Sequence, residues 1–319
     1  MIKFIYDYKY VPGQEMDVSI ILVSYNTKDL TRDCIKSIYE KTEGVSYDIW
    51  VVDNASSDGS VEMIREEFPE VKLIESDKNL GFGRANNLAI KESNAKYCFL
   101  LNTDTVLLNN AVKILFDFME NPKNSGVGVC GGQLFNPDMT YQWSTGEFNS
   151  LDKLYRKSIG INYHQIKYRL KDIFKSRVLK EKRYVHSSSQ EVDYIIGADM
   201  MLRKSALNEV GAFDERFFMF SEEAELCFRL KKQGYKVRFV PDSHILHYGG
   251  ASAYNKNTPL SVEKMLLNGN ILFFKLAYGE DAAKKAKMYY IIYYLRYLVL
   301  RFFTPKAFAR LKTALELKV

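Results

Sequence analysis

The chain has 319 residues, of which 47% are hydrophobic and 26% charged, and its formal net charge is +6. These values fit one large globular domain with a tail, or two small domains. The cysteines Cys34, Cys98, Cys130 and Cys227 lie far apart and form no C-x-x-C pair. Their spacing excludes a disulfide scaffold and a cysteine metal cluster, and it favours a reducing compartment such as the cytoplasm. The modest positive charge is compatible with anionic ligands, including nucleotide diphosphates and acidic lipid.

Residues 1–17 read as an N-terminal extension. Its first part, Met1–Glu15, has no continuous apolar core and no small-residue cleavage site, so we expect no signal peptide. No uninterrupted apolar run in the sequence approaches the ~20 residues that a membrane-spanning helix needs. The sequence therefore predicts a cytoplasmic protein.

Strand-like and helix-like segments alternate through the first part of the chain. Short runs rich in β-branched and aromatic residues predict strands over Val18–Ser24, Tyr47–Asp53, Val71–Glu75 and Tyr97–Asn102. Helices are predicted over Lys28–Lys41, from the turn-rich stretch Asn54–Ser60 to Phe68, and over Gly83–Ser93. Apolar strands of this length, separated by helices, indicate an α/β fold with a largely parallel sheet buried on both faces. Ligands of such sheets bind beyond the carboxyl ends of the strands.

The pattern changes after about Phe135. Residues 136–189 are polar, aromatic and basic with few periodic signals, and a second patterned block runs from Val192 to Val240. From Ser261 onward the sequence favours helix, and its segment Met288–Phe303 is rich in tyrosine and flanked by lysines. This segment is either a helix packed on the domain or on a second subunit, or a patch at a membrane interface.

Two acids mark the carboxyl ends of predicted strands. Asp53 ends the second strand, and Asp104 closes the stretch Leu100–Asp104 after the fourth. Each alone is more typical of a turn or helix cap, but at matching strand ends both are expected to face the ligand crevice. Asp104 is suited to hold a hard divalent cation such as Mg²⁺ or Mn²⁺ against phosphate oxygens.

Glycine-containing loops suggest further ligand contacts. The stretch Asn79–Asn87 contains G-x-G but lies outside the first strand-to-helix turn, where a dinucleotide fingerprint belongs. Gly81 either brings backbone and Arg84 near a phosphate, or only allows a tight turn. His247 precedes the pair Gly249–Gly250, so it is either a structural histidine or part of a site.

The acids of Phe217–Arg229 are the strongest sign of catalysis. Glu222, Glu223 and Glu225 directly follow a run of aromatic residues, which predicts a carboxylate at the floor of an apolar cleft. A carboxylate in that environment can serve as a general base.

The ordered set of these motifs resembles family 2 of the glycosyltransferases, and within it the bacterial rhamnosyltransferase-like branch. The matching stretches cover roughly residues 18–252: Val18–Asn26, Val51–Ser60, Asn79–Phe82 with Asn86 and Asn87, Leu100–Asp104, Gly197–Arg203, Gly211–Glu215, Phe217–Arg229 and His247–Ser252. The resemblance implies a GT-A fold, with a Rossmann-like, mostly parallel sheet flanked by helices and a helical C-terminal tail. It also implies transfer of a sugar from a nucleotide donor with inversion at the anomeric carbon.

The resemblance assigns roles to individual residues. Asp53 resembles the acid that binds the nucleobase, and Asp104 resembles the last acid of the DxD metal motif, with His247 as an additional metal or diphosphate contact. The other positions expected around the nucleotide are Ser24, Tyr25, Asn26, Asn79, Gly81, Arg84, Asn102 and Thr103. Asn102 stands where the first acid of DxD would be, so one carboxylate is expected to carry most of the metal binding.

The same resemblance places the catalytic base on Glu223, the second acid of a block resembling E-D-x-D-L-x-x-R. Glu222, Glu225, Arg229 and Asp199 fall at acceptor or supporting positions. The family usually has aspartate at the positions of Glu223 and Glu225. One extra methylene moves a carboxylate by up to ~1.5 Å, so the backbone must compensate for the longer side chain.

These expectations divide the chain into residues 1–17, a glycosyltransferase domain over 18–255 with a nucleotide-sugar half (18–135) and an acceptor half (136–255), and a helical region over 256–319. The expected partners are a dTDP- or UDP-linked donor, a glycan or lipid-linked acceptor, the inner face of the cell membrane and a second copy of the chain, with no nucleic acid. Branch resemblance favours dTDP-rhamnose as donor, with UDP-hexoses next. The alternatives are a non-catalytic nucleotide-sugar-binding subunit and a nicotinamide-dependent oxidoreductase, which the glycine-free first turn disfavours.

Overall fold

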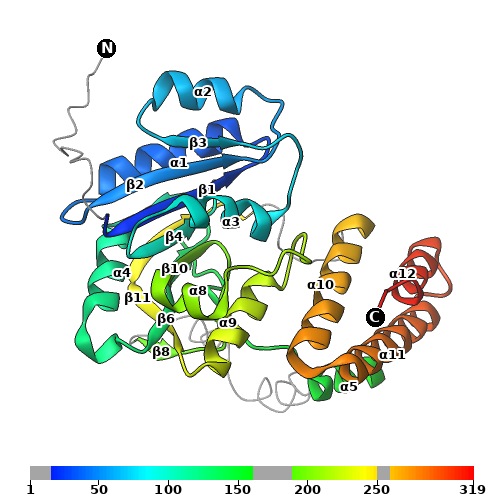
Figure 1. Ribbon diagram of the computed structural model, residues 1–319. Helices are drawn as coiled ribbons and strands as arrows, with labels where there is room; N and C mark the ends of the chain where they lie inside the picture. Colours follow the sequence, from blue (N-terminus) through cyan, green and yellow to red (C-terminus); the bar gives the residue numbers. More distant parts are fainter. Residues whose placement is uncertain (1–15, 161–188, 250–258) are drawn as a thin grey trace.

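The computed structural model describes residues 16–160, 189–249 and 259–319. Within them, a nine-stranded mixed sheet has the order β3-β2-β1-β4-β10-β6-β11-β5, and β8 pairs with β11 beside this path. Helices cover both faces of the sheet, and the C-terminal helices lie together at one end of the molecule (Figure 1). The α/β architecture and the helical C-terminal tail predicted from the sequence are confirmed.

The first half of the sheet is parallel and follows the predicted elements closely. Its strands are β1 (Val18–Ser24), β2 (Tyr47–Asp53), β3 (Lys72–Glu75) and β4 (Tyr97–Leu101), joined by the helices α1 (Lys28–Lys41), α2 (Ser60–Glu67) and α3 (Phe82–Glu92). Since β1 pairs in parallel with both β2 and β4, the loops after these three strands lie at one edge of the sheet. That edge carries most of the residues expected at the donor site.

The second half contains the antiparallel pairings. Its elements are β5 (Thr105–Leu107), α4 (Ala111–Glu120), the 3₁₀ turn η1 (Pro122–Asn124), β6 (Val127–Phe135), β7 (Thr145–Gly146), α5 (Leu151–Ile159), β8 (Gln190–Glu191), β9 (Tyr194–Ile195), β10 (Asp199–Arg203), α8 (Lys204–Val210), α9 (Glu222–Lys232) and β11 (Lys236–His247). Strand β10 runs antiparallel between β4 and β6 and begins opposite Leu101. Its first residue, Asp199, therefore lies at the same sheet edge as the loop after β4.

Alternating strand residues supply the two faces of the core. In β1, Val18, Ile20 and Leu22 join one hydrophobic cluster, which also contains residues of α1, α2 and α4. Ile21 points to the opposite cluster, which contains residues of α3, α8 and α9. This alternation is the period-2 pattern of a strand covered on both faces.

The helix-prone tail forms α10 (Leu260–Tyr278), α11 (Glu280–Leu300) and α12 (Pro305–Leu315). A buried ion pair of 2.7 Å joins Arg310 Nε on α12 to Glu263 Oε2 on α10. The hydroxyl of Tyr294 on α11 donates to the other oxygen of Glu263 at 2.5 Å. Three helices thus share one buried carboxylate, which fixes their relative positions.

Helix α11 contains most of the tyrosine-rich segment. It buries Tyr290, Tyr294 and Leu298 while exposing Met288 and Leu295. The expected packing on the domain is therefore found along one face of the helix. In the described part of the chain, we find no helix with both the length and the apolar character required to cross a bilayer.

Candidate active site

The loop after β1 is tied to the loop after β2. The backbone N–H of Asn26 donates to Ser56 Oγ at 2.9 Å, and Asn26 Oδ1 accepts from the N–H of Ser57 at 2.8 Å. Ser24 is fully buried, and its hydroxyl contacts those of Thr27 and Thr31. This arrangement makes Ser24 an internal support of the loop.

Two further predicted nucleotide contacts lie near this loop. The ring of Tyr25 is about half exposed and stays accessible to a ligand. The hydroxyl of Thr103 contacts that of Thr27 at 3.1 Å, and the N–H of Asn102 donates to the carbonyl of Ala198. The loops after β1 and β4 are therefore joined by side-chain hydroxyls.

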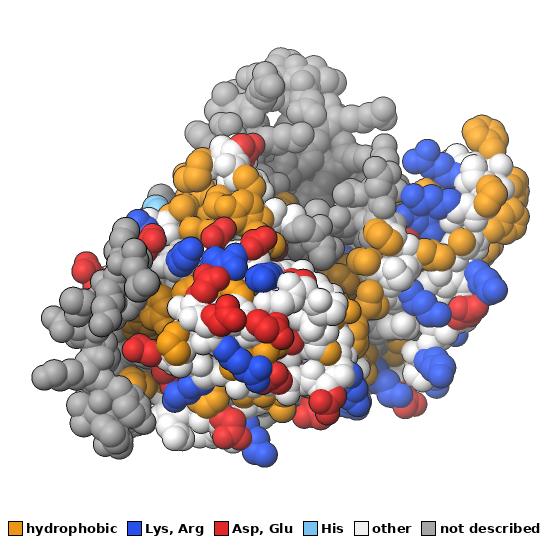
Figure 2. All heavy atoms as spheres, turned by 90° about the horizontal axis from the view of Figure 1, so that it is seen from above, with side chains coloured by type: hydrophobic (Ala, Val, Ile, Leu, Met, Phe, Trp, Pro, Cys, Tyr) orange, Lys and Arg blue, Asp and Glu red, His pale blue; other side chains and the backbone are white. Residues whose placement is uncertain are grey.

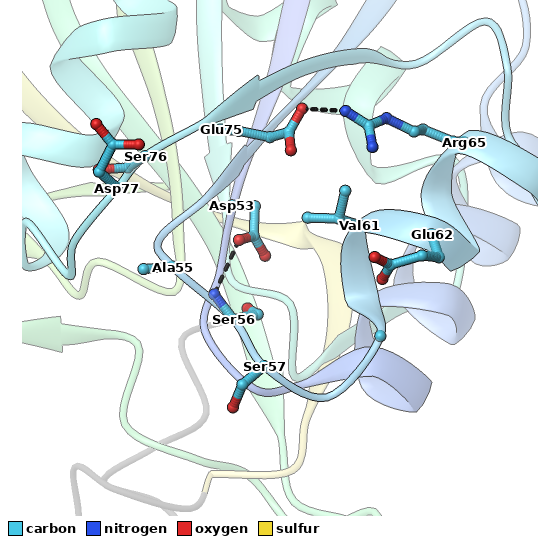
Figure 3. A pocket seen from close by; sticks show the side chains of 11 residues that line it. Asp53, Ala55, Ser56, Ser57, Val61, Glu62, Arg65, Glu75, Ser76 and Asp77 are labelled. Atoms are coloured by element: carbon cyan, nitrogen blue, oxygen red, sulfur yellow. Dashed lines mark hydrogen bonds and ion pairs between the residues drawn. The ribbon is translucent and has the colours of Figure 1, made fainter.

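A pocket of about 570 Å³ opens beside Asp53 at the carboxyl ends of β2 and β3 (Figure 3). Its volume lies within the ~300–1,000 Å³ typical of ligand sites. Asp53 Oδ1 accepts from the backbone N–H of Ser56 at 2.9 Å. Asp53 Oδ2 is buried and has no hydrogen-bond partner among the described residues. A buried unsatisfied carboxylate oxygen is costly, so a ligand donor would find a ready acceptor here.

The loop before α3 docks on the aromatic run that precedes α9. Gly81 has a φ of +82°, and a Cβ atom there would lie 1.9 Å from the carbonyl oxygen of Phe218. The N–H of Phe82 donates to that same carbonyl at 3.0 Å. Asn79 Oδ1 accepts from the N–H of Gly81 at 2.9 Å and fixes the turn. The glycine is thus required for a close backbone contact between the donor side and the acid-bearing segment.

Arg84 joins α3 to the segment before α9. Its Nε donates to the carbonyl of Glu215 at 2.5 Å. The predicted phosphate contact of Gly81 and Arg84 stays a prediction, and the geometry gives both residues a role in joining α3 to the segment before α9.

Asp104 and His247 lie together. Strand β11 pairs antiparallel with β5, with His247 opposite Thr105, so the imidazole lies beside the residue before β5. His247 Nε2 is 3.3 Å from Asp104 Oδ1, and Nδ1 is 2.6 Å from Gln142 Oε1. Gln142 orients the ring as carboxylate or carbonyl partners orient metal-bound histidines. Sequence reasoning missed Gln142, because it lies 105 residues from its partner in a stretch without periodic signals.

The pair has the chemistry of a divalent-cation site. One carboxylate oxygen and one imidazole nitrogen converge on the same region, and such mixed O and N donors suit Mn²⁺ or Mg²⁺ whose other ligands are water and phosphate. No group of three histidine, cysteine, aspartate or glutamate residues suited to a metal occurs in residues 16–160, 189–249 and 259–319. The glycine pair expected after His247 is described only as far as Gly249.

The three glutamates in the first turn of α9 have different environments. Glu225 is buried and pairs with Arg229 at 2.7 Å, and Arg229 also binds carbonyls of the segment that follows α8. Glu222 is buried, with Oε2 unpaired among the described residues. Glu223 keeps a partly accessible side chain. Of the three, Glu223 is the acid whose side chain is the most accessible to a ligand.

Burial raises the pKa of Glu223, although backbone N–H groups at the start of α9 partly oppose the shift. Burial also raises the pKa of Glu222 well above that of a free glutamate, and the charge of Glu223 adds to this. The ring of Tyr194 lies close enough that the Glu223 charge, after burial, contributes to raising the pKa of its hydroxyl. Tyr194 stacks on Phe148, with 6.2 Å between ring centroids. These rings form the apolar wall expected beside the base.

An unusual turn precedes Glu223. Phe220 and Ser221, directly before α9, both have a φ of +73°. A Cβ atom at Gly269 of α10 would lie 2.3 Å from the carbonyl oxygen of Phe220, and the hydroxyl of Ser221 contacts Asn270 Oδ1 at 3.0 Å. Left-handed backbone at two consecutive non-glycine residues costs free energy, so the packed helix must hold it. The C-terminal helical region therefore contacts the turn that aims Glu223.

Asp199 is fully buried at the start of β10. Its Oδ2 accepts from the backbone N–H of Gly132 at 2.5 Å, and its Oδ1 has no partner among the described residues. A Cβ atom at Gly131 would lie 2.5 Å from the carbonyl oxygen of Asp199. Burial raises the pKa of the Asp199 carboxyl well above its usual range. We assign Asp199 to the support of the sheet edge.

Replacing Asp199 with asparagine is expected to stabilise the protein increasingly as pH rises. The folded chain retains a proton that the unfolded chain releases near pH 4, so wild-type stability falls as pH increases above that value. The loss reaches about 1.4 kcal/mol per pH unit until the folded pKa is passed. Denaturant unfolding of both proteins between pH 5 and 8 measures this, and a stability difference that is constant with pH contradicts it.

The fold and the site together define a glycosyltransferase with the GT-A architecture. The structure is similar to that of GalNAc-T7 with UDP, GalNAc and Mn²⁺, with a TM-score of 0.60 and 13% identity over 95% of this chain and 56% of the other. It is also similar to a mannosyltransferase from Pyrobaculum calidifontis in complex with GDP-Man and Mn²⁺, with a TM-score of 0.53 and 14% identity over 97% and 87% of the two chains. The chain belongs to glycosyl transferase family 2, whose model matches residues 19–211.

Curated relatives place the chain in the rhamnosyltransferase-like branch of this family. It is 27% identical to the rhamnosyltransferase WbbL of Escherichia coli K12, over 72% of this chain and 83% of the relative. It is 25% identical to an N-acetylglucosaminyl-diphospho-decaprenol L-rhamnosyltransferase of Mycobacterium tuberculosis, over 63% of this chain and 66% of the relative. A Haloferax volcanii hexosyltransferase, Agl10, is 24% identical over 69% and 64% of the two chains. The family and branch expected from the motifs are confirmed.

Proposed function

We propose that the protein transfers rhamnose from dTDP-rhamnose, with inversion, to a hydroxyl of a saccharide or lipid-linked saccharide in the synthesis of a cell-surface polysaccharide. The observation that carries this proposal is the pocket at Asp53 together with the pair of Asp104 and His247 at the carboxyl edge of the sheet. The partly accessible Glu223 at the start of α9 supplies the candidate base. The similarity to two rhamnosyltransferases supports the sugar.

The unpaired oxygen of Asp53 favours a nucleobase that carries a ring N–H. Thymine and uracil both carry a ring N–H, which can donate to a carboxylate, and Asp53 Oδ2 is a buried acceptor at the pocket. A charged acceptor gives a stronger hydrogen bond than a neutral one. Asp53 would therefore select the nucleobase, while the carboxyl ends of β1 and β4 lie beside the rest of the nucleotide.

Asp104 and His247 would hold a divalent cation, which supplies positive charge against the diphosphate when bound. Both side chains come from adjacent strand ends, and Gln142 fixes the imidazole. Glu223 would take the proton of the acceptor hydroxyl as that oxygen attacks the anomeric carbon. The nucleoside diphosphate leaves from the opposite face, and inversion follows from this single displacement.

A thermal-shift screen of nucleoside diphosphates with Mn²⁺ tests the donor. We expect dTDP and UDP to raise the melting temperature and CDP and ADP to do so far less, since thymine and uracil offer a ring N–H to Asp53 whereas cytosine and adenine have none. Asp53→Ala should remove the shift, whereas the exposed Asp77→Ala, at the rim of the same pocket, should retain it. Equal shifts with all four diphosphates contradict the assignment of Asp53. Turnover of dTDP-rhamnose with UDP-glucose in parallel then separates rhamnosyl from hexosyl transfer.

A non-catalytic nucleotide-sugar-binding subunit is the second candidate. The buried, unpaired Glu222 beside Glu223 is compatible with a site whose acids no longer act on substrate. Donor hydrolysis or transfer that depends on Mn²⁺ or Mg²⁺ and on Glu223 rules this candidate out. Binding of the nucleotide without either reaction supports it.

We further propose that the exposed face of α11 and α12 contacts an acidic membrane surface on the cytoplasmic side. The residues Met288, Ile292, Leu295 and Val299 are exposed at intervals of three and four, which puts them on one stripe of the helix. Phe302 and Phe303, in the turn after α11, and Phe308 on α12 are exposed as well. Hydrophobic and basic side chains lie together at the edge of the molecule on the right of Figure 2. Such a combination is typical of helices that lie in the membrane interface.

The double variant Leu295→Glu, Val299→Glu is expected to lose at least about tenfold of its affinity for phosphatidylglycerol-containing vesicles, because each buried apolar side chain contributes about 1.5–3 kcal/mol. Vesicle co-sedimentation measures it. Leu88→Glu, at an exposed position on α3, is the matched control and should bind like the wild type. Equal binding of both variants contradicts membrane contact through this face, and a change in molar mass on a sizing column would point to a second subunit instead.

A further inference from the structure

A cavity lies within the C-terminal helical region, outside the donor pocket. It occupies about 160 Å³ between α5, α10 and α11. That volume is well below the ~300–1,000 Å³ of pockets for whole cofactors. It can therefore hold one ring-sized group but no nucleotide.

Two asparagines in the lining connect the cavity to the turn before Glu223. Asn270 Oδ1 accepts from Asn149 Nδ2 at 2.7 Å and from the hydroxyl of Ser221 at 3.0 Å. Ser221 lies two residues before Glu223. Asn149 follows Phe148, whose ring stacks on Tyr194 in the wall beside the base. A group in this cavity is thus one hydrogen-bonded side chain away from the turn that aims the base.

The lining combines rings with groups that form directional hydrogen bonds. Tyr290, Tyr293 and Phe274 supply aromatic surface, and Lys157 Nζ lies 5.1 Å from the centre of the Tyr293 ring. Asn149 Oδ1 and Asn270 Nδ2 have no partner among the described residues, so one amide acceptor and one amide donor stay available. Aromatic faces pack on the C–H face of a sugar ring, and amides match its hydroxyls as donor and acceptor.

We propose that this cavity is a subsite for one saccharide unit of the acceptor. The proposal rests on the function proposed above. It adds where the acceptor binds and that a saccharide unit is the group recognised there. A phosphate is the less suitable occupant, because the lining offers no arginine, Lys153 is already paired with Glu147 at 2.7 Å, and Lys157 Nζ lies over the ring of Tyr293. Binding at the subsite would also restrict the movement of Asn270 and so stabilise its hydrogen bond with Ser221 while the acceptor hydroxyl approaches Glu223.

Saturation-transfer NMR on the full chain tests the subsite, with methyl N-acetylglucosaminide and methyl rhamnoside as the sugar probes. Binding of inorganic pyrophosphate is measured separately, by the broadening of its ³¹P line. At least one sugar should receive saturation from the wild type. Tyr293→Ala removes a ring of the lining, and Leu266→Trp fills the cavity. Both should weaken the sugar by at least about tenfold, which corresponds to roughly 1.4 kcal/mol. Tyr155→Ala, an exposed ring on α5 outside the lining, should bind like the wild type.

The melting-temperature shift by dTDP or UDP with Mn²⁺ is measured on the same four proteins. A retained nucleotide shift with lost sugar binding supports the subsite. Sugar binding unchanged in both cavity variants, absence of binding by both sugars to the wild type, or pyrophosphate binding lost in these variants overturns it. If dTDP and UDP do not shift the melting temperature of the wild type, the proposed function is refuted instead. The sugar-binding data can still be interpreted in that case, because they do not depend on the nucleotide.

Discussion

The variant Glu223→Gln is expected to lose transfer by about 10³-fold in kcat, within the 10²–10⁴-fold that a general base contributes. An acceptor hydroxyl has a pKa near that of water, about 15.7, and a free glutamate has one near 4.3. Complete proton transfer before attack would therefore cost about 15 kcal/mol, from roughly 11 pKa units at 1.36 kcal/mol each. The base must take the proton while the new bond forms, and a glutamine cannot.

Nucleotide binding separates this effect from misfolding. Glu223→Gln should retain the melting-temperature shift by dTDP or UDP, because the pocket at Asp53 lies on another segment of the chain. Glu66→Gln, an exposed glutamate of α2, is the matched control and should retain turnover. Near-normal turnover of Glu223→Gln would refute the assignment of the base.

The pH dependence of the wild type gives a second measure of Glu223. A general base acts in its deprotonated form, so the rate falls as pH decreases through its pKa. Burial raises that pKa, and the acid limb of kcat/KM should therefore lie above the pH at which an ordinary glutamate titrates. An acid limb at or below that pH would contradict the raised pKa of Glu223.

The variant Gly269→Ala is expected to lower kcat by about 10²-fold, the cost of misplacing a catalytic group by roughly 1 Å. The added Cβ would lie 2.3 Å from the carbonyl oxygen of Phe220, so α10 and the turn before α9 must separate. Because Glu223 follows three residues later, its carboxylate moves with the turn. The affinity for nucleotide should stay unchanged, since the donor pocket does not contact α10.

Gly126→Ala is the matched control for this substitution. A Cβ atom at Gly126 meets no atom within 4 Å, so the same change in composition should leave kcat at its wild-type value. Steady-state kinetics of both variants decide the matter. Equal turnover of Gly269→Ala and Gly126→Ala would show that the contact with α10 has no influence on the base.

The sequence predicted the donor half of the fold because its signals are local. The strands β1, β2 and β4 are uninterrupted apolar runs, and each is followed by residues that form turns and caps. The antiparallel insertion of β10 between β4 and β6 was not predicted. It depends on Gly131 and Gly132, where a side chain would collide with Asp199 or Ser243, and those contacts join residues more than 60 positions apart.

Some of the candidate site residues could also be predicted from local signals in the sequence. The acids Asp53, Asp104 and Glu223 stand out because each follows an apolar run. Their partners do not: Gln142 lies in a stretch without periodicity, and Asn270 lies inside a helix that reads as ordinary packing surface. Arg84 was predicted to approach a phosphate, and the structure adds its bond to the Glu215 carbonyl, which no spacing in the sequence indicates.

The contact between α10 and the turn at Phe220 and Ser221 also limits how such enzymes can be recombined. A chimera that exchanges the C-terminal helices with those of a relative would place a different helix surface against the carbonyl of Phe220, where Gly269 now packs. The helices α10–α12 therefore cannot be exchanged on their own. An active chimera must also take residues 217–223 from the same parent. The junction between the two parental sequences should lie before Phe217, within the segment that follows α8.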